Sequence, residues 1–281
     1  MKKKMNSVLA SLLVCLVMIM PSITNGQGEK SVIKKYLQKI PAVRVRNTLQ
    51  KYRMTAVYTN RDLYGNFLGK YKVSGDYTRG LENGFVKWNN IYISGSSSFS
   101  GPFPAGTKQD YMENMEYVPS QKMLGPQAFK NFPSTEESVL SRNLIWDMMG
   151  IEEFAWNYTD SLDLNKPFQI PDLKGEFNMA DIGTYNHANI QLCWTGISAI
   201  NNEICAVIEF RATDNKLELS MPALKTKGTE QYWGTVWISL KTHTIESAML
   251  YSGTIQEIEV QSPKNKFIIK TIRDIKLEKI Q

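Results

Sequence analysis

Apolar and polar side chains alternate along much of this chain, and the stretch from Tyr232 to Gly253, YWGTVWISLKTHTIESAMLYSG, shows the pattern clearly. Trp233 and Trp237 occupy one parity of the alternation, whereas Val236, Ile238 and Leu240 occupy the other. Successive side chains of a strand point to opposite faces of a sheet, so this strand carries apolar groups on both faces. Both faces therefore need cover, from protein or from a ligand.

The same period of two recurs in three segments of the first third and in most of the last third. The early segments are rich in tyrosine and β-branched residues and are separated by turn residues, such as Asp62 to Gly65 and the Asn83-Gly84 pair. The predicted strands are Leu49 to Asn60, Asn66 to Gly80, Gly84 to Gly95, Ile190 to Thr195, Ile204 to Ala212, Leu217 to Leu219, Tyr232 to Leu240, Ile245 to Val260 and Phe267 to Ile280. Because neighbouring strands follow one another closely in sequence, we expect a large antiparallel sheet.

Two segments have the period of a helix instead. From Glu29 to Ile40 the apolar residues are spaced three and four apart, and Pro41 follows. In residues 134–157, Ser134 and Glu137 have the spacing of a capping box before an apolar stripe, and Gly150 is expected to interrupt the helix. The fold class is therefore α+β: a large, extended antiparallel sheet with an N-terminal helix and a helical insertion of one or two helices.

Residues 95–126 follow neither period. Glycine, proline and serine occur throughout this segment, which predicts a long irregular excursion of the kind that is usually functional or mobile. Its aromatic residues are candidates for contacts with a glycan or a protein: Phe99, Phe103 and Tyr111.

The first 26 residues read as a secretory signal peptide. Three lysines precede an apolar run from Val8 to Met20, and small residues lie before Gln27, where cleavage is expected. The run is shorter than the ~20 residues that a membrane-spanning helix needs. Cys15 lies inside the run, and the preceding Val14 does not fit a lipid-attachment site. We expect residues 27–281 to form a single β-rich domain that is exported to the periplasm or secreted, without a transmembrane segment.

The net charge of the chain bears on whether nucleic acid is a partner. The whole chain has a formal charge of +6 from 33 basic and 27 acidic residues. Removing the expected signal peptide takes away three lysines and leaves +3, with the lysines scattered along the chain. Nothing in this pattern points to nucleic acid.

Two cysteines remain after the expected cleavage, Cys193 and Cys205, in strands joined by a turn between Ser198 and Glu203. If the hairpin is centred near Ala199, the two cysteines face each other and an exported chain could oxidise them to a disulfide. If Asn201-Asn202 form the turn, the register moves and the cysteines do not meet.

Residues that could support catalysis are few. His187 and His243 are the two histidines, and neither has a metal-ligand spacing; no nucleophile elbow, phosphate-binding loop or dinucleotide fingerprint is present. Carboxylates could in principle act in pairs, as in glycosidases, but no spacing selects a pair among Glu113, Glu116, Glu152, Glu153 and Asp160. We therefore expect a protein that is not an enzyme and that needs neither metal nor cofactor.

Near the C-terminus a strand of the form G-x-hydrophobic-x-hydrophobic, a Lys-Thr turn and an outgoing strand follow one another, at Gly234 to Leu240, Lys241-Thr242 and Ile245 to Met249. In this order of elements the C-terminal third resembles the half-barrel family of exported bacterial lipoprotein carriers and lipid-binding proteins, where the same motif recurs. The resemblance implies a curved sheet with one hollow apolar face, which helices cover as a plug or lid and which acyl chains can fill.

This resemblance leads to a functional hypothesis. We expect the second apolar face to bind a lipid, a lipoprotein or another amphiphile, with an envelope protein as a further candidate partner. The expected ligand contacts are aromatic residues and adaptable methionines: Trp233, Trp237, Met249, Tyr251, Met148 and Met149. A scaffold that binds glycan or protein through residues 95–126 is the alternative, and a hydrolase ranks third.

Overall fold

The computed structural model describes residues 26–41, 43–45, 47–221, 224–261 and 264–280. The chain divides into two units, residues 1–38 and 39–281. The first contains α2 (Gly26–Gln38), which agrees with the helix expected near the N-terminus. The expected signal peptide and Cys15 lie outside the described residues.

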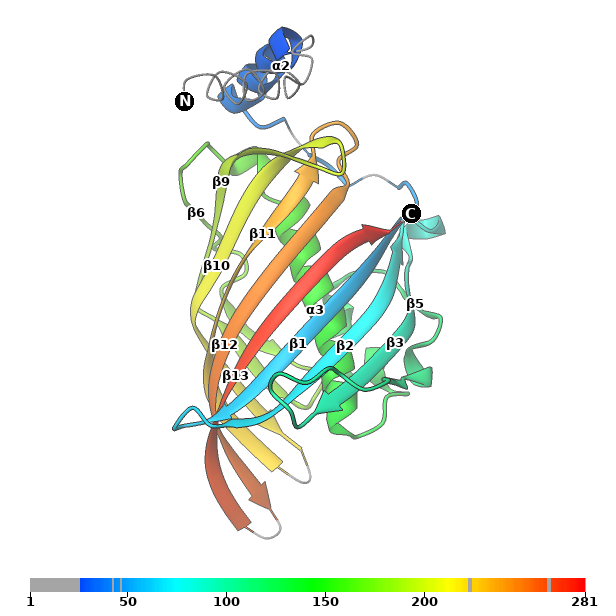
Figure 1. The fold of residues 1–281 in the computed structure, drawn as a ribbon, viewed down its shortest axis with the longest axis vertical. Coiled ribbons are helices and arrows are strands. Elements are labelled where there is room, and N and C mark those ends of the chain that lie inside the picture. Colours follow the sequence, from blue (N-terminus) through cyan, green and yellow to red (C-terminus); the bar gives the residue numbers. More distant parts are fainter. Residues whose placement is uncertain (1–25, 42, 46, 222–223, 262–263, 281) are drawn as a thin grey trace, which may run out of the picture. The chain divides into compact units, whose positions relative to one another are not determined.

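The second unit is dominated by one sheet of 13 strands in its described part, and every named strand pairs antiparallel to its neighbours (Figure 1). The strand order is β4-β3-β2-β1-β13-β12-β11-β10-β8-β7, with β5 beside β3, β9 beside β10 and β6 beside β9. The principal strands are β1 (Gln50–Asp62), β2 (Phe67–Arg79), β3 (Val86–Ser96), β9 (Asn189–Ile200), β10 (Glu203–Ser220), β11 (Leu224–Ser239), β12 (Ile245–Gln261) and β13 (Lys264–Ile280). This confirms the expected antiparallel sheet.

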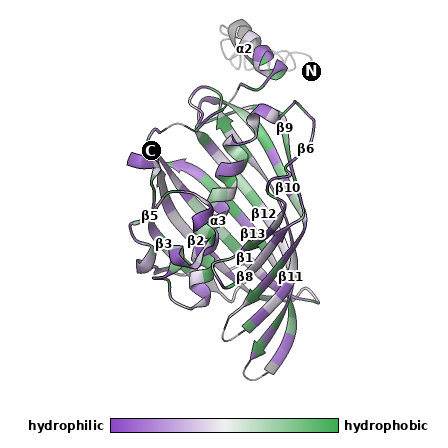
Figure 2. Cartoon of the chain, turned by 180° about the vertical axis from the view of Figure 1, so that it is seen from behind, coloured by the Kyte–Doolittle hydropathy of each residue, from purple (hydrophilic) through white to green (hydrophobic). Residues whose placement is uncertain are grey.

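Alternation assigns each strand's side chains to two faces. On β11, Val236 and Ile238 are fully buried, whereas Trp233 is 51% exposed. The former point to the face that α3 covers, here called the inner face, and the tryptophan points to the outer face. Figure 2 shows α3 lying over the inner face, with strands continuing past the end of the helix.

The helical insertion is α3 (Glu136–Trp156), which contacts β2, β10 and β11. Its N-cap is Thr135, whose hydroxyl accepts a hydrogen bond from the Ser138 amide, so the expected capping box at Ser134 is one residue out of place. The expected break at Gly150 was wrong, because the helix continues through this glycine to Trp156. A single glycine costs a helix only about 1 kcal/mol, which tertiary packing of the flanking residues offsets.

The hydrophobic core lies between α3 and the inner face. Leu144, Ile145, Met148 and Ile151 of the helix are fully buried. Phe154 packs against Phe210 of β10, with ring centroids 4.8 Å apart. The core is dense enough that Gly234 has no room for a side chain, since a Cβ there would lie 2.1 Å from the Met249 carbonyl oxygen and 2.4 Å from the Phe210 ring.

The remaining elements are short. Residues 95–126 hold β4 (Thr107–Lys108), β5 (Met115–Tyr117) and short 3₁₀ helices, which fits the irregular segment expected there. No strand was predicted at β6 (Phe168–Gln169), β7 (Gly175–Asn178) or β8 (Gly183–His187), which add to the β9–β10 side of the sheet. β6 has only two residues, and β7 and β8 are short and contain glycine and asparagine, so none of them shows a clear period of two.

Candidate functional site

A groove of about 1080 Å³ runs along α3 and continues over the part of the inner face beyond the helix. Strands of the sheet, including β7 and β8, contribute to its lining. Residues of α3 and of the segment 118–124 contribute the rest. The groove is the main candidate for a binding site, because concave and mostly apolar cavities of this size are where proteins hold small molecules.

One end of the groove, here called the apolar end, is lined by aliphatic and aromatic side chains near the tips of the four longest strands. The alternation that fills the core with apolar residues continues here without helix cover. Most of these side chains are partly exposed, and Phe267 is 39% exposed. The apolar end consists of Leu217, Leu219, Leu224, Ile258, Val260, Phe267 and Ile269.

A row of polar side chains, here called the polar belt, crosses the inner face between the apolar end and the core. Strand register places its five members side by side on β1, β13, β12, β11 and β10. The polar belt consists of Asn60, Thr271, Thr254, Glu230 and Asn215. Thr271 donates a hydrogen bond to Asn60 over 2.9 Å, and Asn215 is fully buried.

An ion triad joins the polar belt to α3. Arg273 of β13 bonds Asp147 of the helix and lies 3.4 Å from the Glu230 carboxylate of β11. The hydroxyl of Tyr185 donates to the second Glu230 oxygen over 2.7 Å. Burial raises the pKa of Asp147 above its ordinary value, even though Arg273 acts in the opposite direction. The triad therefore places charged groups beside the polar belt, where the sheet meets α3.

The buried polar atoms of groove-lining residues that have no hydrogen-bond partner among the described residues include the Thr226 hydroxyl and the Nε–H of Arg273. Buried polar groups in native proteins are nearly always hydrogen-bonded, to protein or to something else. These atoms fit contacts to water or to the polar part of a bound molecule.

His187 lies at the edge of the groove among aromatic rings. Its ring centroid is 4.8 Å from that of Tyr185 and 5.3 Å from that of Phe177, and its Nε2 lies 3.4 Å from the Tyr232 hydroxyl. Burial lowers the pKa of His187 to about 4, so the imidazole is neutral at pH 7. It adds a polar but uncharged surface.

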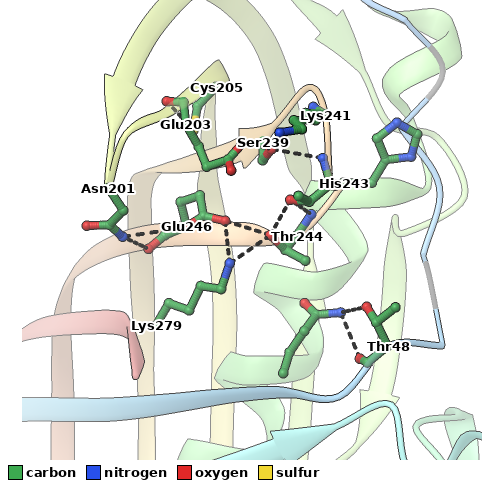
Figure 3. A network of polar contacts seen from close by, with 12 residues as sticks. Thr48, Asn201, Glu203, Cys205, Ser239, Lys241, His243, Thr244, Glu246 and Lys279 are labelled. Atoms are coloured by element: carbon green, nitrogen blue, oxygen red, sulfur yellow. Dashed lines mark hydrogen bonds and ion pairs between the residues drawn. The ribbon is translucent and has the colours of Figure 1, made fainter. Parts of the chain in front are cut away.

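A second polar cluster, drawn in Figure 3, lies at the turns of the β9–β10 and β11–β12 hairpins. Glu246, which is almost fully buried, accepts hydrogen bonds of 2.6 Å from both Thr244 and Lys279. Ser239 donates to Glu203 and accepts from the backbone of the adjoining turn. Because these groups satisfy one another, we assign this cluster a structural role, joining the ends of β10–β13.

The expected ligand contacts divide between three places. Trp233, Trp237, Met249 and Tyr251 lie on the outer face, where the Trp233 and Tyr251 rings stack with centroids 6.2 Å apart. Met148 is buried in the core, and Met149 lines the groove. Of the six residues, only Met149 therefore lines the groove; ligand binding by the outer-face group stays a prediction.

The alternative loop contacts are not grouped either. Phe99 is 60% exposed. Phe103 is half-buried beneath Lys70 and Lys72. Tyr111 packs against Phe132 and hydrogen-bonds the Ser141 hydroxyl, so it belongs to the contact between the loop and α3.

Both cysteines are free. The turn is at Asn201 and Asn202, both with positive φ, which places Cys193 opposite Glu209 and Cys205 opposite Ser198. The cysteines are thus offset by four residues along β10, roughly 13 Å, beyond the ~7 Å that a disulfide can bridge. Of the two registers considered from the sequence, the one without a disulfide is observed.

The candidate carboxylates do not converge. Glu113 contacts Lys108, Glu116 pairs with Lys87, Glu153 contacts Asn157 and Asp160 pairs with Arg44. Glu152 is buried against Arg79 and Tyr77, and burial raises its pKa. Within the described part of the chain, no group of three or more potential metal ligands is found.

The residues that form the apolar end were not singled out from the sequence. Their signal was the pairs Leu217/Leu219, Ile258/Val260 and Phe267/Ile269, which continue the apolar parity among polar neighbours near strand tips. Such pairs read as ordinary strand ends until the tertiary structure shows that they share one uncovered face.

No known family model matches this chain, and no curated protein matches it. Among solved structures, a chain described as showing lipid–protein interactions in lipovitellin aligns with 83% of this chain and 25% of its own length, with 13% identity and a TM-score of 0.45. A DUF1329 family protein from Desulfovibrio piger aligns over 82% of this chain and 86% of its own, with 9% identity and a TM-score of 0.14. Similarity this low implies nothing about what this chain binds. None of the described helices has the length and hydropathy to cross a membrane.

Proposed function

We propose that this protein is a non-enzymatic binding protein that holds the hydrocarbon part of a lipid or other amphiphile in the groove of its inner face. The observation that carries the proposal is the apolar end, where seven apolar side chains from four strands line an open groove of about 1080 Å³. This volume is slightly above the roughly 300–1,000 Å³ typical of ligand pockets.

The energy of binding follows from the area that hydrocarbon would cover. Each buried methylene contributes about 0.8 kcal/mol, so a chain of about 12 methylenes would contribute roughly 10 kcal/mol before costs. Association itself costs on the order of 4–15 kcal/mol. Stable binding therefore needs a long chain, and a fatty acyl group fits this requirement better than a small apolar metabolite.

The polar belt supports an amphiphile rather than a pure hydrocarbon. Thr254, Thr271 and Asn60 place hydrogen-bonding groups along the inner end of the groove, and Thr226 carries a hydroxyl without a partner among the described residues. A polar head at the belt and a chain on the apolar end would match both parts of the groove. The scatter of the carboxylates supports binding rather than hydrolysis, and the positively charged start with its apolar run supports export to the periplasm or beyond.

The test is mass spectrometry of residues 27–281 produced in a bacterial periplasm and purified without detergent. Native and denatured spectra would be compared, together with an organic extract of the same sample. A stoichiometric lipid that leaves on denaturation supports the proposal. For chains offered in competition, shortening by two methylenes should weaken binding about 15-fold, which follows from ~0.8 kcal/mol per methylene.

The chain offers a matched pair of variants for mapping the site. Phe267 and Ile268 are neighbours on β13 with nearly equal exposure, 39% and 38%, but only Phe267 lines the groove. Phe267→Lys should abolish lipid retention because it places a charge among apolar side chains, and Ile268→Lys should retain the wild-type amount. Equal retention by the two variants would show that lipid, if present, lies elsewhere.

A further inference from the structure

The tip of the β1–β2 hairpin exposes large apolar side chains to an unusual degree. Tyr64 is 88% exposed and Leu63 is 65% exposed, and Leu68 follows on β2, also exposed. Phe99 of the 95–126 segment joins them by packing edge-on against Phe67, with ring centroids 5.5 Å apart. Apolar side chains gathered on a projecting turn usually mark a site of interaction.

The turn that presents these side chains is built by hydrogen bonds. One oxygen of Asp62 accepts from the amides of Tyr64 and Asn66, over 2.9 and 2.8 Å, and the other accepts from the Asn66 side chain. Gly65 has a φ of +88°, which few other residues adopt at low cost. The exposure of Leu63 and Tyr64 is therefore a property of a defined turn.

Basic side chains lie on the strands that lead to the apolar tip. The Arg61 guanidinium lies 5.1 Å from the centre of the Phe99 ring, and Lys70 and Lys72 lie 4.7 and 5.3 Å from that of Phe103. Lys270 of β13 is in register with Arg61. Among the described residues, none of these four cations forms an ion pair.

Asp62, the carboxylate at the tip of the hairpin, does not neutralise this charge. Both oxygens of Asp62 are engaged by the turn, whereas Arg61 and Lys70 donate to backbone carbonyls, Arg61 to Gly65 and Lys70 to Phe99 and Gly101. The four basic residues and Asp62 together carry a formal charge of +3.

The hairpin lies beside the apolar end of the groove. Asp62 is paired with Ile269, which lines the apolar end, and Asn60 of the same strand belongs to the polar belt. Figure 1 shows the β1–β2 turn at the edge of the sheet where β12 and β13 continue to their tips. A surface that binds this tip would therefore lie next to the groove.

We propose that the hairpin patch, defined as Leu63, Tyr64, Leu68 and Phe99 with Arg61, Lys70, Lys72 and Lys270, docks the protein on an anionic lipid bilayer. Aromatic residues favour the interface between headgroups and acyl chains. Basic residues near an anionic surface each contribute about 1 kcal/mol, a fivefold gain in affinity. The proposal goes beyond lipid binding in the groove and does not depend on it.

The chemistry favours a bilayer over a protein or a glycan. The apolar side chains project from a convex turn, so they fit a soft surface that closes around them. The surrounding charge is uniformly positive apart from the engaged Asp62, which complements phosphate headgroups rather than a neutral sugar.

The experiment is co-sedimentation of residues 27–281 with vesicles of phosphatidylcholine alone or mixed equally with phosphatidylglycerol. This chain keeps the whole compact unit of residues 39–281 and omits the apolar run at 8–20, which could bind membranes by itself. We expect binding to the mixed vesicles that weakens as salt is added, and at least tenfold weaker binding to phosphatidylcholine alone.

Two double variants test the two components of the patch. Lys72→Gln with Lys270→Gln should weaken binding to the anionic vesicles about 25-fold, at fivefold per charge. Leu63→Ser with Tyr64→Ser should weaken it at least tenfold. As a control, Lys51→Gln with Lys241→Gln removes the same charge from exposed positions elsewhere and should weaken binding less than threefold.

Three outcomes would overturn the proposal: no binding to either vesicle, equal binding to both, or patch variants that match the control. The first would leave a protein or glycan as the partner that this patch fits. Failure of the proposed function can be told apart from failure of docking. A protein that is recovered without lipid but still binds anionic vesicles contradicts lipid binding in the groove and leaves docking intact. A protein that carries lipid but ignores the vesicles contradicts docking alone.

Discussion

The two halves of the inner face have the same alternation but different cover. In the half under α3, Val236, Ile238 and Ala248 are fully buried. Beyond the polar belt, residues of the same parity on the same strands, such as Ile258 and Val260, are partly exposed and line a groove. The first half is core because α3 covers it, and the second half is a candidate site because the helix does not extend over it.

The lengths of the elements explain this difference. The 21 residues of α3 span roughly 32 Å at 1.5 Å per residue. The 17 residues of β12 or of β13 span roughly 56 Å at 3.3 Å per residue. A single helix of that length cannot cover such strands from end to end. The predictions below test this division.

The largest effect is expected at the ion triad. Arg273→Met would leave the buried carboxylates of Asp147 and Glu230 without their cation, and removing one partner of a buried ion pair typically costs about 3–5 kcal/mol. Urea unfolding would measure the change. Arg53→Met, which breaks the more exposed pair with Asp76, should cost less than about 1 kcal/mol. If the two substitutions lowered the free energy of unfolding equally, Arg273 would not belong to a buried ion triad.

Leucine truncations compare the halves directly. Leu144→Ala removes a fully buried helix residue and should lower the free energy of unfolding by about 2–5 kcal/mol. Leu219→Ala, in the partly exposed apolar end, should lower it by about 1 kcal/mol or less, because much of its surface already contacts solvent. If chemical denaturation showed that Leu219→Ala lowers the free energy of unfolding as much as Leu144→Ala does, the apolar end would be packed by protein.

A smaller effect is expected in the pH dependence of stability. The pKa of Asp147 is raised by burial, so its carboxyl binds a proton more tightly in the folded than in the unfolded state. As pH falls through the folded-state pKa toward the ordinary value of 3.8, the wild type should gain stability relative to Asp147→Asn. Denaturant titrations of both proteins at several pH values measure this difference.

Asp76→Asn is the control of opposite sign. Burial acts to raise the pKa of Asp76, but hydrogen bonds from Arg53 and Asn90, with the Arg53 charge, lower it overall. The wild type should therefore lose stability relative to Asp76→Asn as pH falls through the folded-state pKa. The same sign for both variants would contradict the burial of Asp147.

The smallest effect is expected on the outer face. Trp233→Ala removes a half-exposed ring whose stacking on Tyr251 is worth about 0.5–1.5 kcal/mol. Because Trp233 points away from the groove, lipid retention should not change. If Trp233→Ala lost its lipid in the native mass spectrum, the ligand would contact the outer-face residues that the sequence suggested.

Much of the architecture followed from local patterns. The turn at Asp62 to Gly65 and the alternation of β1, β2, β3, β12 and β13 appear in the structure close to where the sequence places them. The helix break at Gly150 was wrong because flanking apolar residues such as Met148 and Ile151 pack on both sides of the glycine. Tertiary packing outweighed a local propensity of about 1 kcal/mol.

The sequence by itself determined that this chain forms long antiparallel strands with apolar groups on both faces, because a period of two is a local property of the backbone. It did not determine which parity faces α3, since the alternation counts tryptophan and valine alike as apolar residues. Only the tertiary structure decided this, by pairing β1 with β13 and laying one helix across part of the inner face. The candidate groove exists because that helix is shorter than the strands it covers, a mismatch between distant elements that no local stretch of sequence encodes.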